Sequence, residues 1–493
     1  MIYTQENYKK SDTFHFDVCI IGSGAGGSAA AWALSKKGLK VALIEAGNYR
    51  TSESFTQRED EMIPELFYDC GGRRTSDRSL RILHGKGVGG STVHNINLCK
   101  RLPREVFDTW NLKNLKFETL IPFYDEIESL LHIRPIETQQ INLANTLFKK
   151  GIDQLGYRGA ILSHNRVGCI GSGFCELGCA YNAKMNALRV FIPMATQMGL
   201  EVFANTQAIQ FEYTNRKIHS LIARTTNGHL LKFLAKTFIS SAGAIEGPAL
   251  LLRSRLPDPY ENIGKHLHLH PGAAIAGVFE EKVESWKGVP QSYECTEFLD
   301  FTKADKRAWI IPSPAHPCGV ASALPGFGSE LREGMKLFSH LLPLAVMLHD
   351  ESTGQVRARD HMGVKIDYQM NASDESQLKT GLKETARILF AAGAKSVQIP
   401  YLDGAHDIKN LSELDRHTFR VAPFDLDFLS VHPMSSLKMG SEEQKSSCDE
   451  SGRYWQIDNL YVADTSLFPT SIGIPPQWSA YAMGLFVASQ IRK

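Results

Sequence analysis

Three cysteines in one glycine-rich stretch have the residue type and spacing to hold a metal cluster. Cys169, Cys175 and Cys179 stand in "GCIGSGFCELGCAYNAK" (168–184), with five and then three residues between them. Thiolates are preferred ligands of iron–sulfur clusters, but a standard cluster takes four of them. The other interpretation is that they are small buried side chains in a loop. The spacing alone leaves both interpretations open.

A second set of residues is spaced to bind the phosphates of a dinucleotide. Gly22, Gly24 and Gly27 form G-x-G-x-x-G directly after the apolar run Asp17–Ile21. In such a motif the first glycine permits a tight turn and the second lets a pyrophosphate approach the backbone, while the third brings the helix close to the strand. The chemistry expected here is anion binding at the N-terminus of a helix.

The elements around these glycines come in the order that a Rossmann-like unit requires. An Ala-rich stretch with helical character continues to about Lys37, and "VALIE" is typical of a second buried strand, ending at Glu45. Glu45 stands where an acidic side chain accepts hydrogen bonds from a ribose hydroxyl, and its charge would repel a 2'-phosphate. NAD and FAD both fit this segment, and the structural alternative is an ordinary glycine-rich turn.

The whole chain is long enough for two or more domains. Its 493 residues carry 54 Lys+Arg against 53 Asp+Glu, so we expect no broad basic surface for nucleic acid. Nine cysteines without the spacing of a small disulfide scaffold favour free thiols in a reducing compartment. No secretion signal is visible, and the longest apolar run, 337–348, is too short to span a bilayer. We expect a cytoplasmic protein without a transmembrane segment and leave peripheral membrane contact open.

Four segments resemble signatures of the glucose–methanol–choline (GMC) oxidoreductases. They are "HGKGVGGSTVHN" (84–95), "SSAGAIEGPALLLRSRL" (240–256), "HPMSSLKMG" (432–440) and "NLYVADTSLFPTSIG" (459–473). They follow one another in the family's order and cover both ends and the middle of the chain. The cysteine-containing loop and "ARILFAAGAKSVQIP" (386–400) are most similar to bacterial relatives of long-chain alcohol oxidases.

The resemblance implies an α/β fold with a Rossmann-like FAD-binding domain assembled from discontinuous segments, plus an α+β substrate domain with an antiparallel sheet. We expect the FAD-binding domain at 12–100, 185–270 and 430–493, and the cap and substrate-binding domain at 101–184 and 271–429. The residues agree with this: β-rich runs alternate with polar turns between about 200 and 240, and 374–394 has helical character.

The resemblance also implies which residues contact the flavin. Gly89, Gly90 and Asn95 fall in the first family signature, where close backbone approach needs small residues. Asp464 resembles the acid near the flavin pyrophosphate and ribityl chain. His94 stands where some members carry a histidine bonded covalently to the flavin; we expect a packed residue beside the isoalloxazine and keep the covalent link as the alternative.

His432 is the expected catalytic base, because it begins the family's H-P motif and a histidine titrates near the working pH. The family pairs this histidine with an Asn or His about 43 residues later, but Pro475 stands there and has no side-chain donor and no N–H. Gln477 has both a donor and an acceptor and is the first candidate for that role, with Ser479 and Tyr481 behind it. The alternative is that all three simply pack their helix.

Two histidine- or cysteine-rich segments could be metal sites. In "HLHLHPG" (266–272), alternating histidines on a strand would put His266, His268 and His270 on one face, as zinc could use. We favour a structural role, since the family has a similar loop there. The three cysteines are similar in spacing to the iron–sulfur loop of family dehydrogenases that pass electrons to a cytochrome. We expect buried thiols instead, and no metal site.

The function predicted from all of this is FAD-dependent oxidation of a small-molecule, apolar alcohol. The hydroxyl proton would pass to His432 and hydride to flavin N5. The electron acceptor (oxygen, quinone or a redox protein) is left open, and so is the choice between oxidase and dehydrogenase. The alternatives are a hydroxynitrile-lyase-like or other non-redox lyase that contains FAD, and a flavoprotein that serves mainly in electron transfer.

Overall fold

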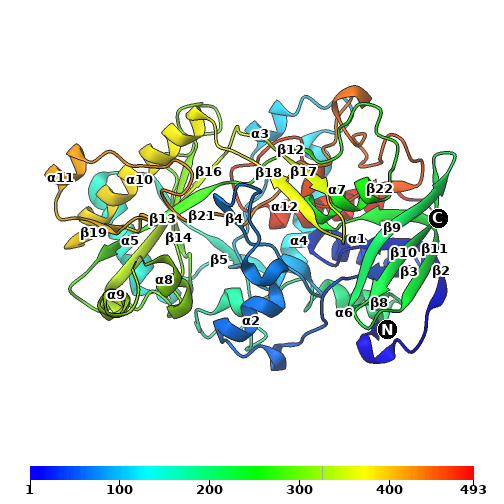
Figure 1. Cartoon of the computed structure of the whole chain (residues 1–493), viewed down its shortest axis with the longest axis horizontal. Coiled ribbons are helices and arrows are strands. Elements are labelled where there is room, and N and C mark those ends of the chain that lie inside the picture. The colour runs from blue at the N-terminus through cyan, green and yellow to red at the C-terminus, as the bar shows by residue number, and fades with distance from the viewer. Residues whose placement is uncertain (325, 493) are drawn as a thin grey trace.

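A computed structural model of the chain describes residues 1–324 and 326–492. The ribbon is organised around two β-sheets at opposite ends of the long axis (Figure 1). Helices cover both sheets, and the segment with α2 (Glu59–Leu66) lies between them. In the part of the chain that the structure describes, no helix has both the length and the apolar character needed to cross a membrane.

The first sheet is mostly parallel and carries the glycine motif. Its strand order is β1-β8-β3-β2-β11-β10-β9, with β22 beside β11. β2 (Asp12–Ile21) pairs in parallel with β3 (Val41–Ile44) and β11 (Leu230–Ser240), while β10 (Lys217–Thr225) runs antiparallel to both β11 and β9 (Thr206–Thr214). The short strands are β1 (Ile2–Tyr3), β8 (Glu201–Phe203) and β22 (Leu460–Val462). The strand excursion predicted before β11 is confirmed.

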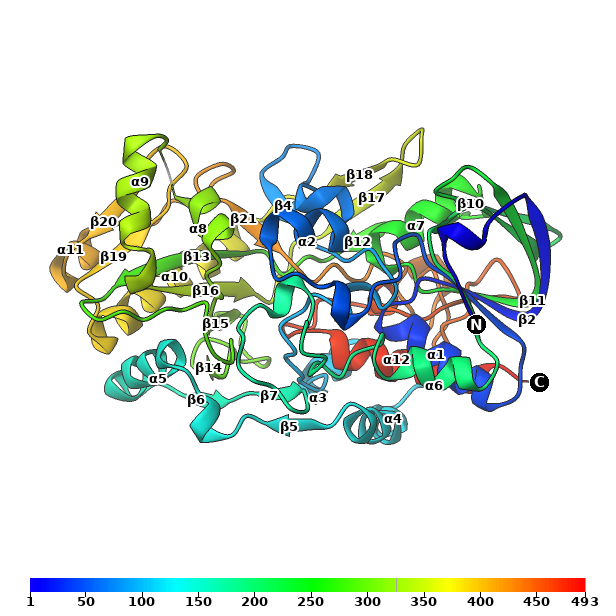
Figure 2. The ribbon, with the colours of Figure 1, turned by 90° about the horizontal axis from the view of Figure 1, so that it is seen from below.

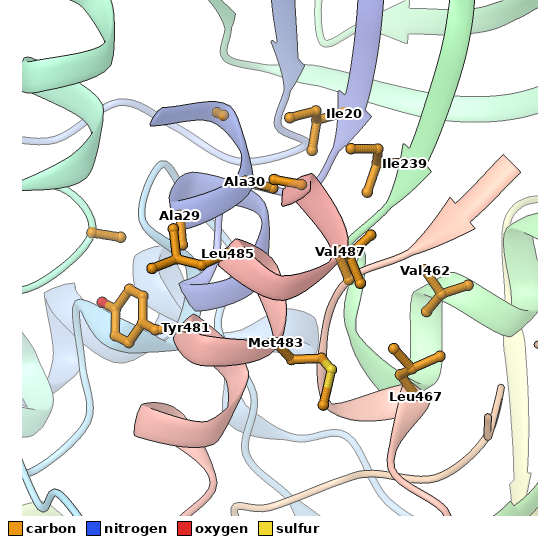
Figure 3. Close-up of a cluster of buried hydrophobic side chains, with 14 of the residues drawn as sticks. Ile20, Ala29, Ala30, Ile239, Val462, Leu467, Tyr481, Met483, Leu485 and Val487 are labelled. Atoms are coloured by element: carbon orange, nitrogen blue, oxygen red, sulfur yellow. The ribbon is translucent and has the colours of Figure 1, made fainter. Parts of the chain in front are cut away.

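Small residues let two helices pack closely beneath this sheet. α1 (Ala25–Lys36) lies against α12 (Gln477–Gln490). A Cβ on Gly26 would stand 1.8 Å from the carbonyl oxygen of Ala463, and one on Gly484 would stand 2.2 Å from that of Gly26. Figure 3 shows the apolar side chains that fill the space between these helices and the sheet: Ile20, Ala29, Ala30, Ile239, Leu485 and Val487.

The second sheet is antiparallel, as predicted, with strand order β20-β19-β13-β16-β15-β14-β6. Its central pair is β13 (Gly272–Val278) and β16 (Leu341–Leu348). α10 (Ala372–Ala392) packs on these strands and on α5 (Leu143–Leu155). The other strands are β6 (Gly159–Ile161), β14 (Tyr293–Cys295), β15 (Ala308–Pro312), β19 (Ser396–Ile399) and β20 (His406–Ile408), with β21 (Phe428–Ser430) and β4 (Leu80–Ile82) off the path.

α4 and β4 make contacts between segments that are far apart in the sequence. α4 (Phe117–Leu130) packs on α12, where Tyr124 Oη donates to Ser479 Oγ at 2.8 Å. β4 pairs with β21 of the second sheet. Figure 2 shows α4, β5, β7, β6 and α5 lying along one side of the molecule, although the chain order is α4, β5, α5, β6, β7. The division into two discontinuous domains stays a prediction.

The remaining elements connect these layers. The helices are α3 (Arg104–Thr109), α6 (Phe191–Gln197), α7 (Gly243–Arg253), α8 (Pro317–Ala323), α9 (Ser329–Lys336) and α11 (Leu411–Arg416). The strands are β5 (Ile133–Pro135), β7 (Ser163–Asn165), β12 (Lys265–Leu267), β17 (Gly354–Ala358) and β18 (Val364–Asp367).

Candidate active site

Two glycine-rich turns meet at the carboxyl end of β2. Gly24 is the N-cap of α1, as the motif predicts, and Gly22 has a φ of +97°. The second turn passes so close that a Cβ on Gly90 would lie 2.8 Å from the Cα of Gly24. Gly89, with a φ of +101°, adopts a backbone conformation that other residues rarely reach. Gly90 is therefore required by the contact between the two turns as well as by the expected ligand.

Ser23 and Glu45 connect these turns, and Ser23 is a residue that the sequence did not single out. Ser23 Oγ donates to Glu45 at 2.6 Å and accepts the Gly89 N–H at 2.9 Å. The Glu45 carboxylate also accepts the N–H groups of Gly47, at 2.9 Å, and of Gly87, at 3.2 Å. Glu45 thus orders both turns while still lining the cavity, and its contact with a ribose stays a prediction.

A cavity of about 290 Å³ lies between the glycine turns and the second sheet. Nine of the eleven predicted site residues line it: Gly22, Gly24, Glu45, Gly90, His94, Asn95, His432, Asp464 and Gln477. Gly27 and Gly89 do not line it. A Cβ on Gly27 would stand 1.9 Å from the carbonyl oxygen of Gly22, so that position serves the packing of the turn itself. The fold brings together residues more than 400 positions apart.

His432 lies on the cavity wall, and its ring is held by a second histidine. The N–H of Gly473 donates to His270 Nε2 at 3.0 Å, so the proton of a neutral His270 ring is on Nδ1. That Nδ1 lies 3.2 Å from His432 Nδ1, which must accept. Burial lowers the pKa of His432 to about 3 and that of His270 well below its usual value. The neutral His432 ring therefore carries its proton on Nε2.

The loop that supplies His270 is fixed by a buried aspartate. Asp350 accepts the N–H of Leu269 at 3.0 Å and the hydroxyl of Tyr368 at 2.7 Å. Burial alone would raise the pKa of Asp350, but His268 beside it holds that pKa below its usual value. The φ angles of His266 (+65°) and His270 (+50°) break the regular strand. The alternation expected to put three histidines on one strand face is thus wrong.

Gln477 begins α12 and has both ends of its amide engaged by the protein. Its Oε1 accepts from Asn95 Nδ2 at 2.7 Å, and its Nε2 donates to the carbonyl oxygen of Leu98 at 2.6 Å. Pro475 also lines the cavity, whereas Ser479 bonds to α4 as described above. Tyr481 is fully buried in the core. Gln477 is thus the one of the three candidates placed at the cavity.

His94 and Asp464 both line the cavity. The His94 ring packs against Phe67 at 4.0 Å between centroids, and its Nε2 is buried without a hydrogen-bond partner in the described part of the chain. Burial lowers its pKa to about 3. Asp464 accepts the N–H of Gly243 at 2.8 Å and that of Ser466 at 2.7 Å, and burial raises its pKa.

The far wall of the cavity comes from the second sheet, and the sequence motifs did not point to it. Trp309 of β15 and Met347 of β16 contribute apolar surface, together with Val431 beside His432. Gln291 and Glu176 add polar groups. These residues lie in strands and loops without a local signature, so that only the packing of the two sheets reveals them.

The three cysteines of the glycine-rich loop surround a second, small cavity of about 20 Å³. All nine cysteines of the chain are free thiols. Among residues 1–324 and 326–492, no three His, Cys, Asp or Glu side chains are grouped closely enough to hold a metal ion. Cys169, Cys175 and Cys179 are half-buried and line this cavity together with Lys184.

Sequence comparisons agree with this geometry. Two models of the GMC oxidoreductase family, for its N-terminal and C-terminal parts, match residues 61–272 and 350–484, and the model of the NAD(P)-binding Rossmann-like domain matches 20–84. An uncharacterized GMC-type oxidoreductase of Mycobacterium tuberculosis is 30% identical over 96% of this chain and 75% of that protein. Long-chain-alcohol oxidase FAO3 of Arabidopsis thaliana is 28% identical over 97% of this chain and 68% of that protein.

Solved structures share the fold at low sequence identity. Pyridoxine 4-oxidase from Mesorbium loti has a TM-score of 0.72 at 17% identity and covers 96% of this chain and 98% of its own. Aspergillus oryzae formate oxidase has a TM-score of 0.73 at 15% identity and covers 97% and 98%. The predicted Rossmann-like fold and the oxidoreductase class are confirmed. With two family models covering most of its length and a relative at 30% identity, the chain belongs to the GMC oxidoreductase family.

Proposed function

We propose that this protein binds FAD and oxidises an alcohol at the cavity between the two sheets. The observation that carries the proposal is the position of His432, a neutral, half-buried imidazole on the wall of the cavity that the two glycine turns also line. Family membership and relatives named as alcohol oxidases support it. The proposed domain division puts the cofactor with the first sheet and the substrate with the second.

The residues present fit FAD. Gly24 caps α1 and lines the cavity, and no atom outside its own turn and helix lies within 4 Å of where its Cβ would be, which leaves room for a phosphate at a helix N-terminus. Arg253 lines the same cavity, and its Nε and Nη1 are buried without partners in the described residues. These unpaired donors suit an acceptor-rich ligand. When bound, FAD supplies the hydride acceptor.

The protein's own residues orient the alcohol and handle its proton. With its proton on Nε2, His432 donates a hydrogen bond to an oxygen in the cavity. To accept the hydroxyl proton at Nε2, the ring needs the other tautomer, with the proton on Nδ1 facing His270. This change of tautomer at His432 requires the His270 proton to move from Nδ1 to Nε2. His270 Nε2 can then no longer accept the hydrogen bond from the Gly473 N–H. The tautomer of His270 thus controls whether His432 Nε2 is free to accept the hydroxyl proton.

An apolar alcohol fits the substrate side best, because Trp309, Met347 and Val431 line it. Relatives and structural neighbours named as oxidases support oxygen as the first electron acceptor to test, ahead of a quinone or a redox protein. Because His94 Nε2 has no hydrogen-bond partner among the described residues, a covalent bond from this atom to the flavin is the alternative to simple packing. Acid precipitation of the protein, followed by a search for flavin in the pellet, tests that bond.

Anaerobic mixing with a panel of alcohols tests the proposal. Bleaching of the flavin absorbance by long-chain primary alcohols is the expected result, and no bleaching by a full panel of long-chain, cyclic and sugar alcohols would contradict it. His432→Ala should slow bleaching by about two to four orders of magnitude; His361→Ala, an exposed histidine, is the matched control. Aldehyde release from a cyanohydrin without bleaching would indicate the lyase alternative, which is kept because Pro475 replaces the family's second catalytic residue.

A further inference from the structure

Lys184 is a buried lysine that the proposed reaction does not use. Only 2% of its surface is exposed. Its Nζ donates to the backbone carbonyl oxygens of Val93 at 2.8 Å and of Cys175 at 2.9 Å, and to that of Asn95. An ammonium group has three protons, and each has an acceptor here. The side chain therefore ties the cysteine-containing loop to residues 93–95, which we call the flavin turn.

The ammonium group is a positive charge without a partner of opposite sign. Burial lowers the pKa of Lys184 to about 8, so the group stays protonated at neutral pH. In the described chain, no carboxylate forms an ion pair with it, and the nearest acidic groups that act on it are the thiols of Cys175 and Cys179 and the carboxyl of Glu176. A buried charge solvated only by carbonyl dipoles keeps a strong field, because little solvent screens it.

That field reaches the cavity through the flavin turn. The carbonyls of Val93 and Asn95 flank His94, and both His94 and Asn95 line the cavity. The charge on Lys184 is also close enough to His94 to lower the pKa of that ring further. A flavin held against the turn would therefore lie within reach of this fixed positive charge, and charge near the flavin ring tunes its electronics.

We propose that Lys184 is a positioning residue that holds the flavin turn and, through its charge, raises the reduction potential of the bound flavin. The inference rests on the proposed FAD site. It also gives the glycine-rich cysteine loop a role that needs no metal: the loop supplies Lys184, which bonds to the flavin turn, and the Cys175 carbonyl, which accepts from Lys184.

Replacing Lys184 with methionine removes the charge and keeps an unbranched chain of similar length. In the FAD-bound Lys184→Met protein, we expect the equilibrium constant for two-electron reduction to fall at least tenfold, which corresponds to about 30 mV. Dye equilibration measures the potential, and the dissociation constant for sulfite, which should rise, is an independent readout. Lys37→Met is the matched control, because Lys37 Nζ also donates to two backbone carbonyls, at 2.7 and 3.0 Å, but does not line either cavity.

If Lys184→Met does not retain FAD, a second variant tests whether charge at this position changes the reduction potential of the flavin. Asn97 lines the small cavity together with Lys184, and Asn97→Asp places a carboxylate there without removing the lysine. The potential should again fall. An unchanged potential in FAD-bound Lys184→Met or Asn97→Asp would overturn the inference. A wild-type protein that binds no FAD would overturn the proposed function as well, so that the two failures are distinguishable.

Discussion

The ring of His270 donates from Nδ1 to Nδ1 of His432, at 3.2 Å, across 162 positions of sequence. Because the Gly473 N–H occupies the other nitrogen of His270, this contact selects one tautomer of His432. A protonated His432 would turn a second N–H toward the His270 donor. The pair therefore opposes protonation of His432, in the same direction as burial does.

Removing the donor should move the pH profile of the reaction. His270→Leu cannot donate, so we expect the pKa of His432 to rise and the acid limb of the flavin-reduction profile to shift to higher pH by about one unit. Wild type should be flat between about pH 5 and 8, since burial keeps His432 neutral there. His270→Asn retains an N–H donor and should restore most of the wild-type profile. Identical profiles for His270→Leu and wild type would contradict the assigned hydrogen bond.

Gln477 offers a test of positioning against direct catalysis. Its amide joins Asn95 of the flavin turn to the Leu98 carbonyl, so Gln477→Leu should cost about tenfold in the rate of flavin reduction, the worth of one or two hydrogen bonds. The flavin absorbance spectrum should shift as well, because Asn95 loses its partner. Gln490→Leu, at the exposed end of the same helix, should change neither. A loss of several orders of magnitude would instead make Gln477 a catalytic residue.

Two neighbouring glycines should respond to alanine in opposite ways. Gly26→Ala forces a Cβ to within 1.8 Å of a backbone oxygen, so we expect it to destabilise the fold by about 3 kcal/mol or more. Gly24→Ala meets no atom outside its own turn and helix within 4 Å, so its Cβ would enter open space at the proposed cofactor site. That variant should fold normally and be purified with less FAD. Thermal unfolding with and without added FAD separates the effect on the fold from the effect on FAD binding. Equal unfolding temperatures for Gly26→Ala and wild type in the absence of FAD would contradict the prediction for Gly26.

Acid should weaken the fold from about pH 6.5 downward. Burial lowers the pKa of His94, His164 and His432 to about 3 each. Below about pH 6.5 these rings bind protons when unfolded but not when folded, so each lowers the free energy of unfolding by about 1.4 kcal/mol per pH unit. This stability is complete above pH 6.5 and is lost progressively as the pH falls toward the folded pKa.

Urea unfolding at several pH values between about 5 and 7.5 measures this slope. His164→Gln should reduce the slope by about one proton, because it removes one buried ring. His361→Gln, which changes an exposed ring, should leave it unaltered. A free energy of unfolding independent of pH in this range would show that the buried histidines do not control acid stability.

The sequence by itself determined the features that depend on neighbouring residues. The turn between β2 and α1 requires Gly22 and Gly24 within three positions, and a buried strand needs a continuous apolar run. The order of strand, glycines, helix, strand and Glu45 therefore predicted the Rossmann-like unit. The four family signatures predicted the second glycine turn and the position of His432 on the cavity.

Only the tertiary structure decided which distant groups meet. Ser23 faces Glu45 and Gly89, Lys184 reaches the carbonyls of residues 93 and 95, and His270 reaches His432. None of these contacts has a local pattern, because each depends on how separate segments pack around the two sheets. The left-handed backbone at His270 likewise lies beside a long-range contact, because the N–H of His270 donates to the buried Asp350. Residue spacing predicts a turn or a strand, but a long-range hydrogen bond needs both partners to be placed by packing.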